Sequence, residues 1–401
     1  MTEWRYVEYQ ELSAPERSAF SMGPFGSKLT KEDYVATGVP VVRGVNLARG
    51  TFVDDDFVFI SHVKADEIMS ANVKPGDLIF THRGTIGQVS MIPREPRFNR
   101  YVIGSSQVKT RLDESIARPE FYYYWFRSTE GQRSILANAS TVGVPGIATP
   151  LTSIRKLLVP LPSCGEQNAI VSALGALDEK IAVNERISSN LDELIRNLWD
   201  LRLRESGSRE IAFLDALEIK FGAPFNSSDF NSEGVGRPLL RIRDLKTFAP
   251  KVWTTQRLDK ESVVATGDVV AGMDAEFRPV FWLGEEALLN QRVMHARSRI
   301  GGGIPLCREA MRGPLALVEN YKTGTTVAHL NKSDLATLLV EVPSAEAVSS
   351  FESATAPLHK RLVASADENR TLTTLRDTLL PQLMSGKLRV REAEKIVEDA
   401  V

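Results

Sequence analysis

The sequence predicts an α+β protein built as a tandem duplication, in which a strand-rich domain followed by a long helix occurs twice. Three observations support this fold class. Short segments of the first half recur in the second half in the same order. Short β-branched runs separated by Gly, Pro and Asp fill two long stretches of the chain. Each stretch is followed by a stripe of apolar residues with the spacing of a coiled-coil helix.

Five pairs of segments carry the repeat. They are 38–47 with 236–245, 74–80 with 265–271, 105–108 with 290–293, 153–163 with 334–344, and 177–181 with 358–362. A single pair of this kind would be chance. Five pairs in the same order indicate that the chain arose by duplication.

The strand-rich domains are predicted at 1–164 and 206–344. In the first of them, Pro119 is expected to open a helix that runs through the aromatic cluster 121–126. These rings could form a platform on which bases stack. We favour packing of the helix against a sheet, because stacking platforms are usually spread across a sheet face.

Long helices are predicted at 165–205 and 345–385, followed by a tail at 386–401. The first helix carries a stripe formed by Ile170, Leu174, Leu177, Ile181, Asn184, Ile187, Leu191, Leu194, Leu198 and Leu201. The second carries a poorer stripe formed by Phe351, Leu358, Leu362, Asn369, Leu372 and Leu379. This spacing predicts that the helices pair, with the two asparagines fixing the register. Two amphipathic helices on a globular core are the alternative, but they would not need stripes of this length.

Composition and charge favour a binding protein that does not rely on bulk charge. The 401 residues include 49 Lys and Arg against 51 Asp and Glu, which gives a net charge of −2. Binding to nucleic acid would therefore need local patches or a partner. No apolar run approaches the roughly 20 residues of a membrane helix. The polar N-terminus does not resemble a secretory signal, so we expect a cytoplasmic protein without membrane contact.

The sequence contains no recognisable catalytic or cofactor motif. It has no phosphate-binding loop and no G-x-G-x-x-G after a strand, and its five histidines lack the spacing of metal ligands. Cys164 and Cys307 suggest neither a zinc site nor a disulfide framework. The acidic run 54–56 is better explained as a solvated loop than as a metal site. We therefore expect a protein that is not an enzyme and binds no metal or cofactor itself.

Several segments resemble the DNA-specificity (S) subunit of type I restriction-modification enzymes. They are Gly-Pro-Phe-Gly-Ser-Lys at 23–28, Gly-Val-Pro-Val at 38–41, Gly-Asp-Leu-Ile-Phe-Thr at 76–81, Arg-Gly-Thr-Ile-Gly at 83–87, Val-Pro-Leu-Pro at 159–162 with Glu-Gln at 166–167, and the ending at 379–390. The resemblance covers nearly the whole chain and includes the duplication. In the second copy, Met-Asp-Ala-Glu-Phe-Arg at 273–278 stands in place of the Arg-Gly-Thr-Ile-Gly segment.

The resemblance implies that 1–164 and 206–344 are target-recognition domains, each reading one half of a bipartite sequence in double-stranded DNA. The two helices would pack antiparallel about a pseudo-two-fold axis, hold the domains apart and dock two copies of a DNA methyltransferase subunit. A restriction subunit, a translocase and nuclease, would join them. S-adenosylmethionine, ATP and Mg would be bound by these partners. The alternative is a coiled-coil protein–protein adaptor without DNA specificity of its own.

Two sets of residues are the candidates for these roles. Base readout needs Arg, Lys, Gln or Asn side chains on loops, although a surface salt bridge or loop hydrogen bond is the alternative for each. The candidates for DNA contact are Lys28, Arg43, His82, Arg83, Thr85 and Gln107 in the first domain, and Arg241, Arg243, Arg278, Gln291 and Arg292 in the second. The candidates for helix pairing and the subunit interface are Ile170, Leu174, Leu177, Ile181, Asn184, Leu191, Leu198, Leu358, Leu362, Asn369, Leu372 and Leu379.

Overall fold

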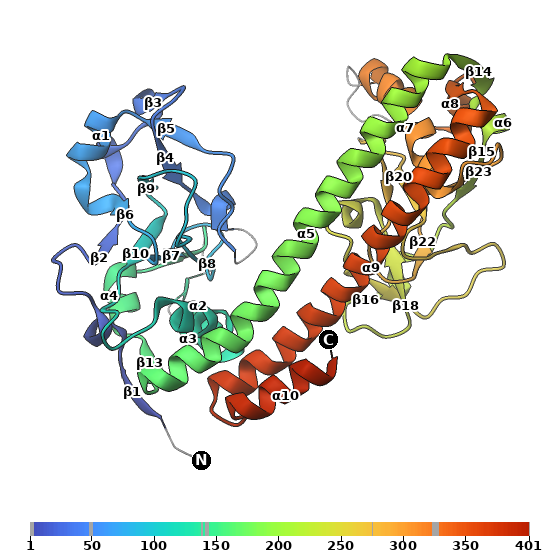
Figure 1. Ribbon diagram of the computed structural model, residues 1–401. Helices are drawn as coiled ribbons and strands as arrows, with labels where there is room; N and C mark the ends of the chain where they lie inside the picture. Colours follow the sequence, from blue (N-terminus) through green and yellow to red (C-terminus); the bar gives the residue numbers. More distant parts are fainter. Residues whose placement is uncertain are drawn as a thin grey trace. The chain divides into compact units, whose positions relative to one another are not determined.

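The computed structural model describes residues 4–47, 51–137, 139–140, 144–274, 276–322 and 329–400. The chain forms two compact units (Figure 1). Unit 1 comprises Met1–Asp178 and Thr373–Val401, and unit 2 comprises Glu179–Leu372. No helix in the described part of the chain combines the length and the apolarity that a membrane crossing needs.

Unit 1 is built around two sheets. Its strands are β1 (Arg5–Glu8), β2 (Phe20–Met22), β3 (Tyr34–Val35), β4 (Val39–Val42), β5 (Val58–Ile60), β6 (Asn72–Val73), β7 (Leu78–Thr81), β8 (Val89–Met91), β9 (Tyr101–Ile103), β10 (Gln107–Thr110), β11 (Ala139–Ser140), β12 (Gly146–Ile147) and β13 (Leu158–Leu161). The four-stranded sheet has the order β2-β10-β7-β8, and the five-stranded sheet has the order β3-β5-β4-β9-β6. In addition, β1 pairs with β13 and β11 pairs with β12.

The predicted aromatic helix is confirmed. The helices of unit 1 are α1 (His62–Glu67), α2 (Pro119–Arg127), α3 (Thr129–Leu136), α4 (Pro150–Arg155), the start of α5 (Cys164–Ser206), the end of α9 (Ala345–Met384) and α10 (Val390–Ala400). Pro119 opens α2, and all six rings of the aromatic cluster are buried. Phe126 packs edge-on against Phe80 of β7, with ring centroids 4.8 Å apart. The rings therefore build the core and do not form a platform for bases.

Unit 2 repeats this architecture. Its strands are β14 (Ser208–Ala212), β15 (Leu217–Phe221), β16 (Phe230–Asn231), β17 (Arg237–Leu240), β18 (Trp253–Thr254), β19 (Val263–Val264), β20 (Val269–Gly272), β21 (Pro279–Phe281), β22 (Ala287–Leu289), β23 (Val293–Ser298) and β24 (Leu339–Pro343). Its further helices are α6 (Phe213–Ala216), α7 (Gly303–Lys322) and α8 (Lys332–Ala336). The sheets have the orders β15-β23-β20-β21 and β16-β18-β17-β22-β19, and β14 pairs with β24.

The predicted duplication is confirmed, because each sheet of unit 2 has the strand order of its counterpart in unit 1. One predicted pairing is wrong by one residue. Gln107 of β10 lies opposite Thr81, and Val293 of β23 lies opposite Gly272, so Gln107 corresponds to Val293 and not to Arg292. Because side chains alternate between the faces of a strand, this slip would have placed the equivalent residues on opposite faces.

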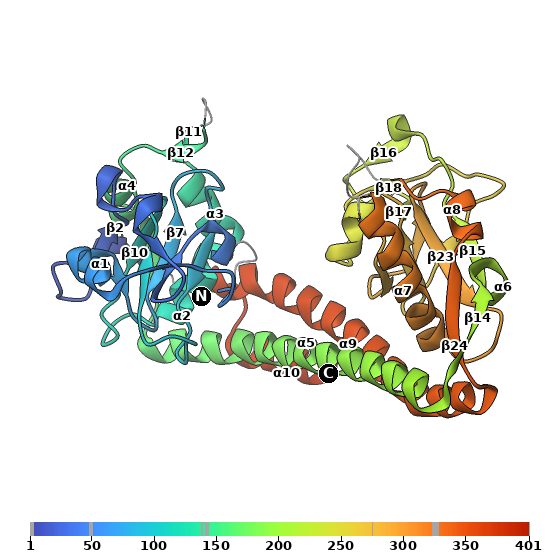
Figure 2. The same ribbon diagram turned by 90° about the horizontal axis from the view of Figure 1, so that it is seen from above.

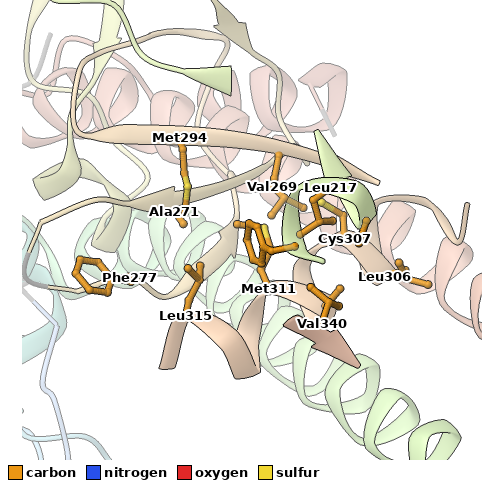
Figure 3. Close-up of a cluster of buried hydrophobic side chains, with 14 of the residues drawn as sticks. Leu217, Val269, Ala271, Phe277, Met294, Leu306, Cys307, Met311, Leu315 and Val340 are labelled. Atoms are coloured by element: carbon orange, nitrogen blue, oxygen red, sulfur yellow. The ribbon is translucent and has the colours of Figure 1, made fainter. Parts of the chain in front are cut away.

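The core of unit 2 lies between α7 and the strands beside it (Figure 3). Figure 2 shows α7 alongside β23 and β24. Cys307 and Met311 of α7 are buried against side chains of β20 and β24 such as Val269 and Val340. Burial raises the pKa of the Cys307 thiol to about 12, which makes this cysteine an apolar core residue and not a reactive one.

The long helices pair antiparallel within each unit. In unit 2, the side-chain amide of Asn184 on α5 donates to Asn369 Oδ1 on α9 at 3.0 Å, and the Trp199 and Phe351 rings lie 5.3 Å apart. In unit 1, Arg376 Nη1 of α9 lies 2.8 Å from Asp178 Oδ1 of α5. The other pairing candidates are buried or half-buried: Ile170, Leu174, Leu177, Ile181, Leu191, Leu198, Leu358, Leu362, Leu372 and Leu379.

The predicted stripe of α5 is out of phase after Asn184. Leu194 and Leu201 are exposed, whereas Ile195 and Trp199 are buried. The stripe position that follows Asn184 is Ser188. Because Ser188 is polar, the apolar pattern of the sequence points to the neighbouring Ile187 instead. On α9, Thr355 and Ser365 are fully buried in the same way. The predicted tail at 386–401 contains the helix α10.

Candidate nucleic-acid interface

In unit 1, the DNA-contact candidates gather around the turn at 104–106, which joins β9 of one sheet to β10 of the other. We call it turn 1. Its hydrogen bonds, each 2.9 Å long, run from Gly104 N–H to Val42 O, from His82 N–H to Ser106 O, and from Gly23 N–H to Gln107 O. The segments that follow β2, β4 and β7 therefore converge at one edge of the unit.

Two candidates at turn 1 are buried and hydrogen bonded to backbone. His82 Nε2 lies 3.1 Å from Ser105 O, and burial lowers the pKa of its imidazole. The amide of Gln107, in its hydrogen-bonding orientation, donates to Gly104 O and accepts from Gly44 N–H, both at 3.3 Å. These contacts help to hold turn 1 in place, and a contact of His82 or Gln107 with DNA stays a prediction.

The other candidates of unit 1 are accessible. Lys28, Arg83 and Thr85 are exposed. Arg43 is half-buried, and its Nη2 donates to Asp56 O at 2.9 Å. The sequence analysis missed Phe25, whose ring is 54% exposed and lies 6.3 Å from the His82 ring. A phenylalanine within the turn-forming segment Gly-Pro-Phe-Gly at 23–26 was a sequence signal that could have identified it.

Unit 2 builds the same turn at 290–292, between β22 and β23. We call it turn 2. Its hydrogen bonds run from Asn290 N–H to Leu240 O at 3.2 Å, from Met273 N–H to Arg292 O at 2.9 Å, and from Gly222 N–H to Val293 O at 3.0 Å. Met273 thus corresponds to His82, and Arg292 corresponds to Ser106. The scaffold is the same in both units, but the side chains that it presents differ.

A glycine is required beside each turn. A Cβ atom on Gly23 would lie 1.8 Å from Gly104 O, and a Cβ atom on Gly222 would lie 1.9 Å from Asn290 O. No other residue permits so close an approach between two backbone segments. This explains why a glycine opens the Gly-Pro-Phe-Gly segment in the first copy and the Gly-Ala-Pro-Phe segment in the second.

The candidates of unit 2 lie along the same edge but have different partners. Gln291 and Arg292 are exposed on turn 2, and Arg243 is exposed nearby on the 3₁₀ helix that follows β17. Arg241 is half-buried, because its Nε pairs with Asp244 Oδ2 at 3.3 Å. Arg278 is exposed just before β21 and lines a cavity of about 630 Å³ that α5, α7 and β21 enclose.

Asp274 and His329, which were not predicted as site residues, lie beside turn 2. Asp274 Oδ1 lies 2.6 Å from His329 Nδ1, and Asp274 Oδ2 lies 3.6 Å from Arg292 Nε. Asp274 follows β20 at the position that Arg83 holds after β7, since both form an isolated bridge with a later segment. Asp274 was not a candidate because base readout was expected from Arg, Lys, Gln and Asn side chains, whereas Asp274 is a carboxylate that pairs with Arg292.

A buried ionic cluster joins α5 to α7 inside unit 2. The carboxylate of Glu309, with no exposed surface, lies 2.5 Å from Arg308 Nη2 and 2.9 Å from Arg312 Nε. Arg308 also pairs with Asp192 of α5, and Arg312 pairs with Asp200 of α5. These contacts join α7 of unit 2 to the part of α5 that belongs to the same unit.

The described residues include no group of three or more His, Cys, Asp and Glu side chains that could hold a metal ion. In the acidic run at 54–56, the side chain of Asp54 forms hydrogen bonds with a neighbouring loop and strand. Asp54 accepts hydrogen bonds from the Tyr101 hydroxyl and from Arg97 N–H, both at 2.7 Å. These donors leave the carboxylate in a structural role.

Comparison with known proteins shows what the chain is similar to. Residues 26–193 match the family described as the type I restriction modification DNA specificity domain. The chain is similar to the specificity subunits of type I restriction-modification systems.

The chain has relatives in Escherichia coli and in Methanocaldococcus jannaschii. It is 27% identical over 215 residues to the type I restriction enzyme EcoBI specificity subunit of Escherichia coli. This alignment covers 53% of this chain and only 40% of the length of that protein. It is 25% identical over 424 residues to the MjaIX specificity subunit of Methanocaldococcus jannaschii, covering 90% of this chain and 89% of the relative. The crystal structure of the type I system S subunit from M. genitalium shares the fold, with a TM-score of 0.57, 16% identity, and coverage of 95% of this chain and 96% of that one.

Proposed function

We propose that 1–164 and 206–344 each read one half of a bipartite sequence in double-stranded DNA. The observation that carries this proposal is the pair of equivalent turns. Turn 1 and turn 2 share their backbone hydrogen bonds, but Ser105 and Ser106 of the first correspond to Gln291 and Arg292 of the second. A constant scaffold with different side chains is what two readers of different sequences require.

Within this proposal, six exposed residues remain the candidates for DNA contact. They are Lys28, Arg83 and Thr85 in unit 1, and Arg243, Gln291 and Arg292 in unit 2. Arg43 and Arg241 can contact DNA only if they release their present partners, Asp56 and Asp244. Arg278 can do so only if its side chain leaves the cavity that it lines. Phe25 joins the first set, since an exposed ring can stack on a base or wedge between two.

We further propose that the subunit docks two copies of a DNA methyltransferase subunit and one type of restriction subunit. S-adenosylmethionine, ATP and Mg would be bound by those partners. The net charge of −2 supports this division of labour, because partner subunits would then supply most phosphate contacts. In unit 2, the exposed apolar side chains of Val183, Leu194 and Leu201 on α5 offer a surface for such docking.

The proposal predicts that the purified chain neither methylates nor cuts DNA by itself. Adding its methyltransferase partner should give S-adenosylmethionine-dependent adenine methylation at a bipartite sequence, measured by incorporation of a labelled methyl group and by sequencing. Turnover by the chain alone, surviving removal of contaminants, would contradict it. A gel-shift of the complex without sequence preference would instead favour the adaptor alternative.

A further inference from the structure

Arg292 has a backbone conformation that arginine rarely adopts. Its φ is +74°, and it is the third residue of a turn closed by a hydrogen bond of 3.2 Å from Val293 N–H to Asn290 O. A positive φ at this position is typical of a type II turn, where glycine or asparagine is preferred. Ser106, the equivalent residue of turn 1, is not among the residues with positive φ. Retaining arginine at a strained position points to a use for its side chain.

The side chain of Arg292 forms an ion pair through its Nε atom. Asp274 Oδ2 lies 3.6 Å away, and the other carboxylate oxygen of Asp274 lies 2.6 Å from His329 Nδ1. Asp274 and His329 also face each other across an isolated β-bridge, and Leu330 N–H donates to Met273 O at 2.8 Å. The carboxylate is therefore fixed by its backbone and by the imidazole, and it restricts the orientation of the guanidinium.

The far end of the guanidinium is accessible. The Arg292 side chain is half exposed, and within the described part of the chain neither Nη1 nor Nη2 donates a hydrogen bond. An arginine that pairs through Nε can present its two terminal nitrogens as a planar fork. This fork matches the O6 and N7 acceptors of guanine in the major groove.

We propose that Arg292 reads a guanine edge in the half of the target that unit 2 recognises, with Asp274 and His329 as its positioning residues. This inference rests on the proposed function of the chain. A phosphate would be a poorer ligand here, because Asp274 offsets the charge of Arg292 and would itself repel a phosphate. The adjacent pair of Lys246 Nζ and Glu276 Oε1, 2.8 Å apart, is charge-balanced as well.

The test uses the complex of the full chain with its methyltransferase partner. Methylome sequencing first gives the wild-type target. Duplexes with that target then carry 7-deazaguanine, which lacks N7, at each guanine of the half-site in turn. One substitution should weaken binding of the wild-type complex by about 10-fold or more, because one charge-assisted hydrogen bond is lost. The same substitution should have no effect on a complex with Arg292→Gly.

The variants separate side-chain chemistry from folding. Arg292→Gly accepts the positive φ without strain, so that it should fold at least as well as the wild type. It should lose about 5- to 150-fold discrimination at one base pair of one half-site. Arg292→Lys keeps the charge but lacks the fork and should lose most of this discrimination, and Asp274→Asn should lose part of it. Arg209→Ala removes an exposed arginine on β14 as the matched control.

The outcomes distinguish this inference from the function on which it rests. If the wild-type complex shows no sequence-specific methylation, the proposed function fails. If the wild type is specific but the motif of the Arg292→Gly complex is unchanged, or if unit 2 reads a half-site without a G·C pair, the proposed function stands and the role of Arg292 is wrong. A uniform loss of affinity for all sequences, with a smaller salt dependence, would show that Arg292 contacts a phosphate.

Discussion

Replacing Arg308 with alanine is expected to lower the free energy of unfolding of unit 2 by about 3–5 kcal/mol. The Arg308 side chain is almost completely buried and pairs with Asp192 and Glu309, and its guanidinium carbon lies 4.2 Å from the centroid of the Phe281 ring. Alanine would leave the fully buried carboxylate of Glu309 with Arg312 as its remaining partner. Removing one member of a buried ion pair is costly because the other charge stays in a medium of low polarity.

Two further variants show whether the cost arises from the stranded charge. The double variant Arg308→Met with Glu309→Leu removes both charges and should recover most of the loss. Arg257→Ala breaks an exposed pair with Glu261, 3.7 Å apart, and should change stability by no more than about 0.5 kcal/mol. Urea unfolding of the purified chain measures all three. A single variant Arg308→Ala that unfolds like the wild type would show that the cluster contributes no net stability.

Two adjacent residues on α5 should lose very different amounts of stability when each is replaced with alanine. Ile195 is completely buried between the paired helices and the core of unit 2, whereas Leu194 is 44% exposed. Ile195→Ala should cost about 2–5 kcal/mol, because it removes buried methyl groups and leaves a cavity. Leu194→Ala should cost about 0.5 kcal/mol or less.

The same unfolding measurement on the free chain separates these two variants, each of which is the other's control. The two substitutions have similar volume and helix propensity effects, so that the difference between them reports burial. Equal costs, or a larger cost for Leu194, would restore the phase of the stripe that the sequence analysis predicted.

The duplication was predictable because the repeated segments include the strands and turns that carry equivalent hydrogen bonds in both units. The segments at 38–47 and 236–245 contain β4 and β17 with the polar side chains that cap the next turn, Asn46 and Asp244. The helix phase was predicted less well, since Ser188 interrupts the apolar pattern while keeping the seven-residue repeat. Apolar periodicity alone does not identify buried polar residues on a helix stripe.

The candidate interface was only partly predictable, and for a different reason. Residue type indicated which side chains could contact a base, but not which of them the backbone of the turns would sequester. His82 and Gln107 bond to carbonyl groups of turn 1, and these contacts depend on tertiary structure. Asp274 and His329 lie far apart in the sequence and come together only through an isolated bridge. Such pairs have no local sequence signature.

The central claim is that the chain contains two separate readers, with boundaries predicted at 1–164 and 206–344. Exchanging 206–344 for the equivalent domain of a related specificity subunit tests it directly. The exchanged protein is combined with the original methyltransferase partner, and the methylated sequences are determined across a bacterial genome. Wild-type protein and the exchange of 1–164 serve as matched controls.

Exchanging 206–344 should change one half of the methylated sequence and leave the other half as in the wild type. Exchanging 1–164 should change the opposite half. This result would follow from the two turns with equivalent hydrogen bonds and different side chains. A target in which both halves change after either exchange would mean that the two units share one recognition surface, and it would contradict the account.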